Sequence, residues 1–345
     1  MTGLPWHQQA LRELLARRER MPHAVLLTGR EGFGKVEFAR ALAQSMLCEQ
    51  PAAGGLACGA CPACGWFGEG NHPDYREVLP DNLVEDEPDA EAVATDAKPE
   101  KKSAAITVDQ IRALQQFITL STHRAGWRVL VLHPAEAMNP QAANALLKTL
   151  EEPTPHTLML LVTDQAGRLM PTVRSRCQVV TVPGCEPSAA EAWLVEQGLS
   201  GRVAQDVLAQ AGGAPLLALA WADEAWQDSR RQVLTALAEP ERADWLQLAG
   251  ALEKTDLKPI LHWVHTWCCD LVLQQQTGGV RHHPDFAKAA AKLADRASAL
   301  ALFRFESELR QLRRHIQHPL NARLWLEHLL LSYSLVVAPA DAGRD

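Results

Sequence analysis

The residues with the clearest chemical signature form a glycine-rich loop between an apolar run and a helical pattern. The loop, Gly29–Val36, reads Gly-Arg-Glu-Gly-Phe-Gly-Lys-Val and keeps three of the four fixed positions of a Walker A loop: Gly29, Gly34 and Lys35. In such a loop, backbone N–H groups and a helix N-terminus surround the phosphates, and the lysine reaches the terminal ones. The fourth position should be Ser or Thr, whose hydroxyl binds Mg²⁺, and here it is Val36. The sequence therefore predicts a phosphate-binding loop that lacks one of the usual Mg²⁺ ligands.

The second half of a hydrolytic site is missing as well. The apolar strand Val129–Leu132 should end in an acidic pair that holds Mg²⁺ and orients the attacking water, but His133-Pro134 occupies that place. Glu136, three residues further on, is a weak substitute. Because the bridging cation is poorly held, we expect little or no ATP hydrolysis. Two interpretations stay open for the loop: an inert structural role, and binding of ATP or ADP without turnover.

Four cysteines form a second chemical cluster, with the spacing C-x9-C-x2-C-x2-C: Cys48, Cys58, Cys61 and Cys64. Four thiols this close in a reducing compartment favour a tetrahedral Zn²⁺ site. Because protein thiolates fill all four positions, the predicted zinc is structural and clamps a loop to a helix end. The alternative is a set of unligated, buried cysteines.

The other cysteines and one histidine pair carry less signal. The scattered Cys177, Cys185, Cys268 and Cys269 are interpreted as small apolar residues. His282-His283 is a weak metal candidate, and we interpret it as an exposed turn before Pro284.

The elements that position these residues follow from the hydrophobic pattern. The first half alternates short apolar runs with helical patterns, which predicts a parallel sheet flanked by helices in an α/β domain at 1–183. The predicted strands are Ala24–Thr28, Tyr75–Leu79, Arg128–Leu132, Thr157–Thr163 and Gln178–Val182. The predicted helices are Lys35–Leu47, Asp109–Leu120 and Gln141–Glu151. This domain would carry the cysteine insertion at 48–64.

After Pro183, the pattern predicts helices throughout. Short helices that suit a small, lid-sized domain at 184–225 are predicted at Pro187–Gln197, Arg202–Ala211 and Pro215–Glu224. Longer helices, in an all-helical domain at 226–345, are predicted at Leu257–Gln276, Asp285–His315 and Leu320–Val337. The leucines and tryptophans of the longer helices recur at helical spacing and are either core alone or also an oligomer surface.

Composition narrows the class of protein. A chain of 345 residues with 47% hydrophobic and 22% charged residues is typical of a soluble protein of several domains, and no apolar run approaches membrane-spanning length. Without a signal-peptide pattern, a cytoplasmic location with reduced thiols is expected. The formal charge of −7 argues against a free-standing DNA binder. Residues 80–105 are acidic and then lysine-containing, which predicts a disordered acidic loop.

Two further segments resemble subunits of the bacterial clamp loader, which belong to the AAA+ proteins. These segments are Asn144–Pro153, which reads Asn-Ala-Leu-Leu-Lys-Thr-Leu-Glu-Glu-Pro, and Arg174-Ser175-Arg176-Cys177. The four-cysteine insertion and His72-Pro73-Asp74 are similar to the family too, and the likeness runs from the P-loop through Val182 and weakly on to 321–330. The resemblance implies a RecA-like AAA+ domain, a small helical lid domain and an all-α collar domain that joins a pentameric ring.

The resemblance also assigns residue roles. The Ser-Arg-Cys triplet is similar to the motif whose arginine reaches ATP held by the neighbouring subunit, so Arg176 is implied as an arginine finger in trans and Arg174 is the weaker candidate. Such a finger contributes roughly 10³ to 10⁵ in rate. The motor subunits, called gamma or tau, keep the P-loop hydroxyl, the acidic pair and an arginine on the lid. Val36, His133 and Gly212–Pro215 provide none of these.

The implied function is therefore that of a non-hydrolysing subunit of the clamp loader in the DNA polymerase III holoenzyme, a DNA-directed DNA polymerase and nucleotidyltransferase complex. The implied partners are the delta subunit and three gamma or tau subunits, and through the ring the sliding clamp and primed DNA, with no membrane contact. Two rivals stay open. One is a working ATPase of the gamma or tau type, and the other is a zinc-dependent nucleic-acid-binding module that kept an inactive P-loop.

Overall fold

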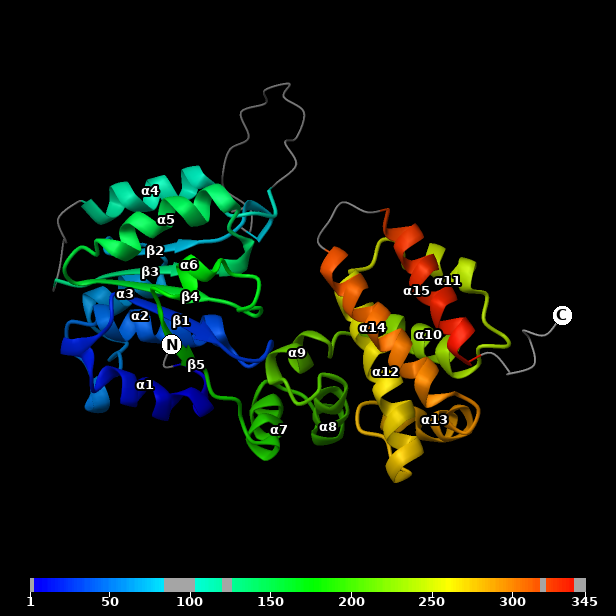
Figure 1. The fold of residues 1–345 in the computed structure, drawn as a ribbon. Coiled ribbons are helices and arrows are strands. Elements are labelled where there is room, and N and C mark those ends of the chain that lie inside the picture. Colours follow the sequence, from blue (N-terminus) through cyan, green and yellow to red (C-terminus); the bar gives the residue numbers. More distant parts are fainter. Residues whose placement is uncertain (1–2, 84–102, 120–125, 317–320, 338–345) are drawn as a thin grey trace, which may run out of the picture. The chain divides into compact units, whose positions relative to one another are not determined.

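The computed structural model describes residues 3–83, 103–119, 126–316 and 321–337 and divides the chain into two compact units, Met1–Glu186 and Pro187–Asp345 (Figure 1). Most of the acidic loop predicted at 80–105 lies outside the described residues. Across the described ranges, no helix combines the length and the apolar character that crossing a membrane requires.

Five parallel strands form the sheet of the first unit, in the order β2-β3-β4-β1-β5. The strands are β1 Ala24–Thr28, β2 Tyr75–Val78, β3 Arg128–Leu132, β4 Thr157–Val162 and β5 Gln178–Thr181. The predicted α/β class with a parallel sheet is confirmed, and each predicted strand ends within one residue of the observed one. The strands β3 and β4 are buried along their whole length, whereas β5 is a largely exposed edge.

Helices cover both faces of this sheet, because alternate residues of each strand enter two separate cores. On one face, Leu130 and Leu132 of β3 belong to the core that also contains residues of α4 (Val108–Thr119), α5 (Pro140–Glu151) and α6 (Pro171–Arg174). On the other face, Val129 and Val131 belong to the core with α1 (Gln8–Leu15) and α2 (Lys35–Leu47). Figure 1 shows α4 and α5 on one side of the sheet and α1 and α2 on the other.

The helix α5 illustrates how local sequence sets the ends of an element. Asn139 caps its N-terminus, because the side-chain oxygen accepts the N–H of Ala142 at 2.7 Å, and Pro140 needs no N–H at the first helical position. The helix ends at Glu151, before Pro153, as predicted. The helix α3 (Pro62–Gly68), which carries part of the cysteine cluster, was not predicted.

The described elements of the second unit are helices, in agreement with prediction. They are α7 Pro187–Glu196, α8 Gly201–Gln210, α9 Pro215–Ala220, α10 Glu224–Ala238, α11 Trp245–Leu252, α12 Leu257–Thr277, α13 Ala287–Ala294, α14 Ala299–His315 and α15 Ala322–Val337. The prediction of one helix over Asp285–His315 was wrong. The chain forms a short 3-10 turn, Pro284–Phe286, followed by α13 and α14, and the extended backbone of Ser298 separates the two helices.

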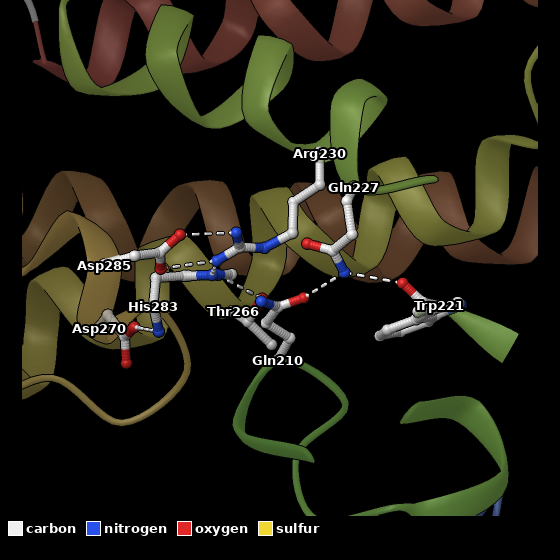
Figure 2. A network of polar contacts seen from close by, with 8 residues as sticks. All are labelled: Gln210, Trp221, Gln227, Arg230, Thr266, Asp270, His283 and Asp285. Carbon is white, nitrogen blue, oxygen red and sulfur yellow. Dashed lines mark hydrogen bonds and ion pairs between the residues drawn. The ribbon is translucent and has the colours of Figure 1, made fainter. Parts of the chain in front are cut away.

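A buried polar network lies at the centre of this unit (Figure 2). The guanidinium of Arg230, on α10, donates to both carboxylate oxygens of Asp285, at 2.7 and 2.9 Å, and to Nδ1 of His283 at 2.9 Å. Because the guanidinium only donates, Nδ1 must accept and the proton of His283 sits on Nε2, which donates to Thr266 Oγ1 at 3.0 Å. Asp270 accepts the backbone N–H of His283 at 2.8 Å. This network fixes the segment between α12 and α13.

The interpretation of His282-His283 as an exposed turn was wrong. His283 is fully buried, and His282 is half-buried with Nδ1 near the backbone oxygen of Ala209 at 3.3 Å. Burial, followed by the charge of Arg230, lowers the pKa of His283 to about 3. The reason for the error is long range, because the partner Arg230 lies 53 residues away in the sequence.

The same network reaches α8 and α9. The amide of Gln227, on α10, donates to Gln210 Oε1 at 2.9 Å and to the backbone oxygen of Trp221 at 2.7 Å (Figure 2). The domain boundary predicted between 225 and 226 falls inside α10, which starts after the capping residue Asp223. A division of 187–345 into a lid and a collar therefore stays a prediction.

Candidate functional site

The P-loop lies at the carboxyl edge of the parallel sheet, where ligands bind in open α/β folds. Because all strands run in the same direction, this edge brings together the loop after β1, His133 after β3 and Asp164 after β4. Gly34 precedes α2 with φ of 87°, a left-handed conformation that suits glycine, and Lys35 is the first residue of the helix. The loop predicted from the sequence is thus found between a strand and a helix.

Lys35 is already engaged by the protein itself. Its ammonium forms an ion pair with Asp164 Oδ1 at 2.5 Å and donates to the backbone oxygen of Arg30 at 2.8 Å, and the side chain is only 5% exposed. A P-loop lysine normally reaches the terminal phosphates of a nucleotide. Here the carboxylate of Asp164 is the anion that pairs with the lysine.

Glu136 contacts the turn that carries Asp164. One of its oxygens accepts the backbone N–H groups of Asp164 at 3.1 Å and Gln165 at 3.2 Å. The carboxylate therefore holds the turn that carries Asp164. Its second oxygen, Oε2, is buried without a hydrogen-bond partner among the described residues, and the role of Glu136 as a substitute for the acidic pair stays a prediction.

His133, which occupies the place of the acidic pair, belongs to a separate ion-pair cluster. Its Nε2 lies 2.7 Å from Glu77 Oε1, and Arg40 and Tyr75 also donate to this carboxylate. Burial alone would raise the pKa of Glu77, but the hydrogen bonds from His133 and Arg40 and the charge of Arg40 lower it to about 2. The carboxylate of Glu77 is thus occupied by contacts with Arg40, Tyr75 and His133.

The N-terminal segment contacts the loop from outside the motif. The ring nitrogens of Trp6 and His7 donate to the backbone oxygen of Phe33 at 3.1 and 2.9 Å. A Cβ atom at Gly34 would overlap the side chain of Leu4. Burial lowers the pKa of His7 to about 4, so the ring is neutral at pH 7. No spacing in the sequence marks these contacts, since the partners lie 26 and 27 residues apart.

These residues do not fit a magnesium nucleotide. Mg²⁺ is held by oxygen ligands, and the fourth P-loop position is Val36, which packs against the core below α2. A phosphate would also have to displace Asp164 from Lys35. In this structure Lys35 is paired with Asp164, and the absence of ATP hydrolysis by this chain stays a prediction.

The predicted cysteine cluster is brought together. The sulfur atoms of Cys48, Cys58, Cys61 and Cys64 all lie within 4.8 Å of one another. Among the described residues, no other group of three or more His, Cys, Asp or Glu side chains lies close enough together to hold a metal ion. Cys48 follows α2, and Cys61 and Cys64 lie at the start of α3. The cluster thus joins a loop to two helix ends.

The cluster has the dimensions and the donors of a tetrahedral metal site. Cys48 Sγ lies 3.6 Å from Cys58 Sγ and 3.9 Å from Cys61 Sγ. Tetrahedral Zn–S bonds of about 2.3 Å place the sulfurs roughly 3.8 Å apart. Backbone N–H groups of Ala60 and Cys61 point at Cys58 Sγ and lower the pKa of this thiol. The four residues therefore fit a metal ion that thiolates bind.

The predicted arginine finger follows α6 and is partly exposed. Arg176 Nη1 donates to the backbone oxygen of Thr172 at 2.9 Å, and Nη2 pairs with Glu151 at 2.6 Å. Arg174, the weaker candidate, is exposed. The Gly212–Pro215 segment forms the turn between α8 and α9, where Gly213 has φ of 86°.

The other cysteines behave as small apolar residues to different degrees. Cys268 belongs to the helical core, while Cys177, Cys185 and Cys269 are half-buried, and all four are free thiols. Burial raises the pKa of Cys177 to about 11.

Comparison with known proteins gives two matching family models. The model described as "DNA polymerase III, delta subunit" matches residues 7–186, and the model described as "DNA polymerase III, delta subunit, C terminal" matches residues 224–334. The protein named DNA polymerase III subunit delta' in Pseudomonas aeruginosa is 33% identical over 97% of this chain and 98% of its own length. Its namesake in Escherichia coli is 28% identical over 98% of this chain and 97% of its own length.

Two further similarities involve proteins named as gamma-related or tau subunits. The DNA polymerase III subunit tau of Salmonella typhimurium is 30% identical over 46% of this chain and 21% of its own length. A solved structure of a DNA polymerase III gamma subunit-related protein from Thermotoga maritima aligns with a TM-score of 0.40 and 18% identity, covering 95% of this chain and 99% of that one.

Proposed function

Since this chain belongs to the family of DNA polymerase III delta' subunits, we propose that it is a non-hydrolysing subunit of the bacterial clamp loader. In this role it helps to place the sliding clamp on primed DNA during replication in the cytoplasm. The observation that carries the proposal is the pairing of Lys35 with Asp164 in a P-loop without its metal-binding hydroxyl.

The activity of the chain would then lie in the site of a neighbour. Arg176 acts as an arginine finger in trans, where its guanidinium stabilises charge on the phosphoryl group of ATP held by an adjacent gamma or tau subunit. Its partial exposure, at 36%, supports a role outside its own unit. Residues 184–225 serve as a lid and 226–345 as a collar in a pentamer with the delta and motor subunits.

The cysteine cluster binds a structural Zn²⁺ in this proposal. Thiolate donors and tetrahedral sulfur spacing support that metal, and a filled shell of four sulfurs leaves no position for catalysis. The metal content of the purified chain tests the assignment. One zinc per chain is expected, and loss of that zinc in Cys61→Ser but not in Cys185→Ser would identify the ligands.

The proposed function is tested by DNA-stimulated ATP turnover in a reconstituted clamp loader. We expect Arg176→Ala to slow turnover, while Arg174→Ala and Lys35→Met leave it unchanged when the variant chains are folded. The arginine control is matched, because Arg174 lies two residues away and is exposed. A loss of turnover in folded Lys35→Met, with Arg176→Ala unaffected, would refute the proposal.

That opposite result would favour the alternative, a working gamma or tau-type ATPase. The tau relative is about as similar in identity, at 30%, but matches only 46% of this chain. Val36 and His133 also argue against that alternative, because neither supplies an oxygen ligand for Mg²⁺.

A further inference from the structure

Two segments that stand apart in the sequence meet at one ion pair. Glu151 belongs to the Asn144–Pro153 segment and is the last residue of α5, whereas Arg176 follows α6. Glu151 Oε1 lies 2.6 Å from Arg176 Nη2, and the second nitrogen, Nη1, donates to the backbone oxygen of Thr172 at 2.9 Å. The proposed role of Arg176 in trans makes no use of Glu151.

The position of Glu151 is unfavourable for a carboxylate unless a cation is near. The C-terminal end of a helix carries partial negative charge, so acidic residues there are disfavoured and cations are favoured. Arg176 supplies such a cation directly at the end of α5. The ion pair thus gives both the acidic residue and the arginine a fixed place.

The contacts with Glu151 and Thr172 orient one side of the Arg176 guanidinium and leave some of its N–H donors available. An arginine has five N–H donors in a planar fork, and Glu151 and Thr172 engage one donor of each terminal nitrogen. Since the side chain is 36% exposed, the remaining donors can reach an anion presented from outside. The same geometry holds the arginine in place before a partner arrives.

We propose that Glu151 is the positioning residue for Arg176 and that it pre-orients the guanidinium for the ATP of the neighbouring subunit. This inference rests on the proposed function of Arg176 in trans. A free arginine side chain has large rotamer entropy, which must be lost when the finger docks. A finger that is already oriented loses less, so the neighbouring site reaches its transition state more readily.

The test uses the reconstituted clamp loader with the full chain carrying Glu151→Gln, and Glu152→Gln serves as the matched control. Glu152 is the adjacent, exposed glutamate. We expect Glu151→Gln to lower kcat for DNA-stimulated ATP turnover about threefold, which is less than the effect of Arg176→Ala, with KM for ATP unchanged. The control should match the wild type, and the melting temperature of each chain should stay constant because the pair is exposed.

A double variant separates this inference from the function on which it rests. In the Arg176→Ala background, Glu151→Gln should have no further effect on kcat, because the residue acts through the arginine. If Arg176→Ala slows turnover but Glu151→Gln does not, or if Glu151→Gln speeds it, the positioning role is wrong while the finger stands. If Arg176→Ala itself has no effect, the proposed function fails first.

Discussion

Each of the two units buries a cation that is paired with an aspartate, and the burial is nearly the same. Lys35 is 5% exposed and Asp164 37%, whereas Arg230 is 4% exposed and Asp285 47%. The surroundings differ. Lys35 starts a helix behind a glycine-containing loop whose backbone suits an anion, while Arg230 lies within α10 and also contacts the neutral ring of His283.

This difference shows that burial and pairing alone do not separate a binding site from a structural ion pair. The backbone around the cation makes that distinction. If Asp164 is lost, an external phosphate can still approach Lys35, because the loop geometry remains. If Asp285 is lost, a buried arginine is left beside a histidine that accepts one hydrogen bond and carries no negative charge.

Among the substitutions, the largest effect is expected for Asp285→Asn. Arg230 is 4% exposed, so the loss of its counter-ion leaves a buried charge uncompensated, but Asp285 is 47% exposed, which reduces the cost. We therefore expect the free energy of unfolding of the second unit to fall by about 2 kcal/mol. Urea unfolding measures this loss. Asp228→Asn is the control, because its partner Arg231 is 68% exposed and the variant should change stability by less than about 0.5 kcal/mol. Equal losses in both variants would remove the contrast between the two units.

A fall in pH should also destabilise the two units to different extents. Burial lowers the pKa of His262 to about 4 and of His283 to about 3 in the second unit, and lowers that of His7 to about 4 in the first. The unfolded state, with a pKa near 6.5, takes up protons first, so this stability is complete above about pH 6.5 and is lost as the pH falls toward 4.

At pH 5, each buried histidine should cost about 2 kcal/mol, so the second unit should lose about twice as much as the first. Hydrogen exchange resolves the two units separately in one sample. Comparison at pH 7 and pH 5 should show a larger loss of protection in α12 than in α2. Equal losses would mean that these histidines do not control the acid response.

The smallest effect is expected for Asp164→Asn. Lys35 loses its counter-ion, but the loop is accessible to solvent on the side of Asp164, so we expect a loss of only about 1 kcal/mol. Pyrophosphate should restore the melting temperature of this variant and leave that of the wild type unchanged. The double variant Asp164→Asn with Lys35→Met should not respond. A wild-type chain that responds equally well would show that Asp164 does not block the loop.

The sequence predicts those features whose determinants are local. The strand β1 and the loop after it follow from an apolar run and glycines at fixed spacing, and the zinc candidate follows from cysteines close together in the chain. The break before α14 was missed, because the alanine- and leucine-rich sequence around Ser298 continues the helical pattern.

The partners of Lys35 and His283 could not be predicted in this way. Asp164 reaches Lys35 only because β1 and β4 are neighbours in the sheet, and Arg230 reaches His283 only because α10 packs beside α12. A polar residue directly after a buried strand was a usable signal for Asp164, since such residues gather at the edge with the P-loop. No comparable signal marks Arg230.

The pairing of β1 has a consequence for biosynthesis. Ala24 pairs with Met159 of β4, and Val25 pairs with Gln178 of β5, so the apolar strand β1 has no sheet neighbour until more than 130 further residues have been made. At about 5–20 residues per second, this delay is roughly 7 to 26 seconds. During that time the nascent chain carries an unpaired apolar strand, and such a strand is prone to aggregation.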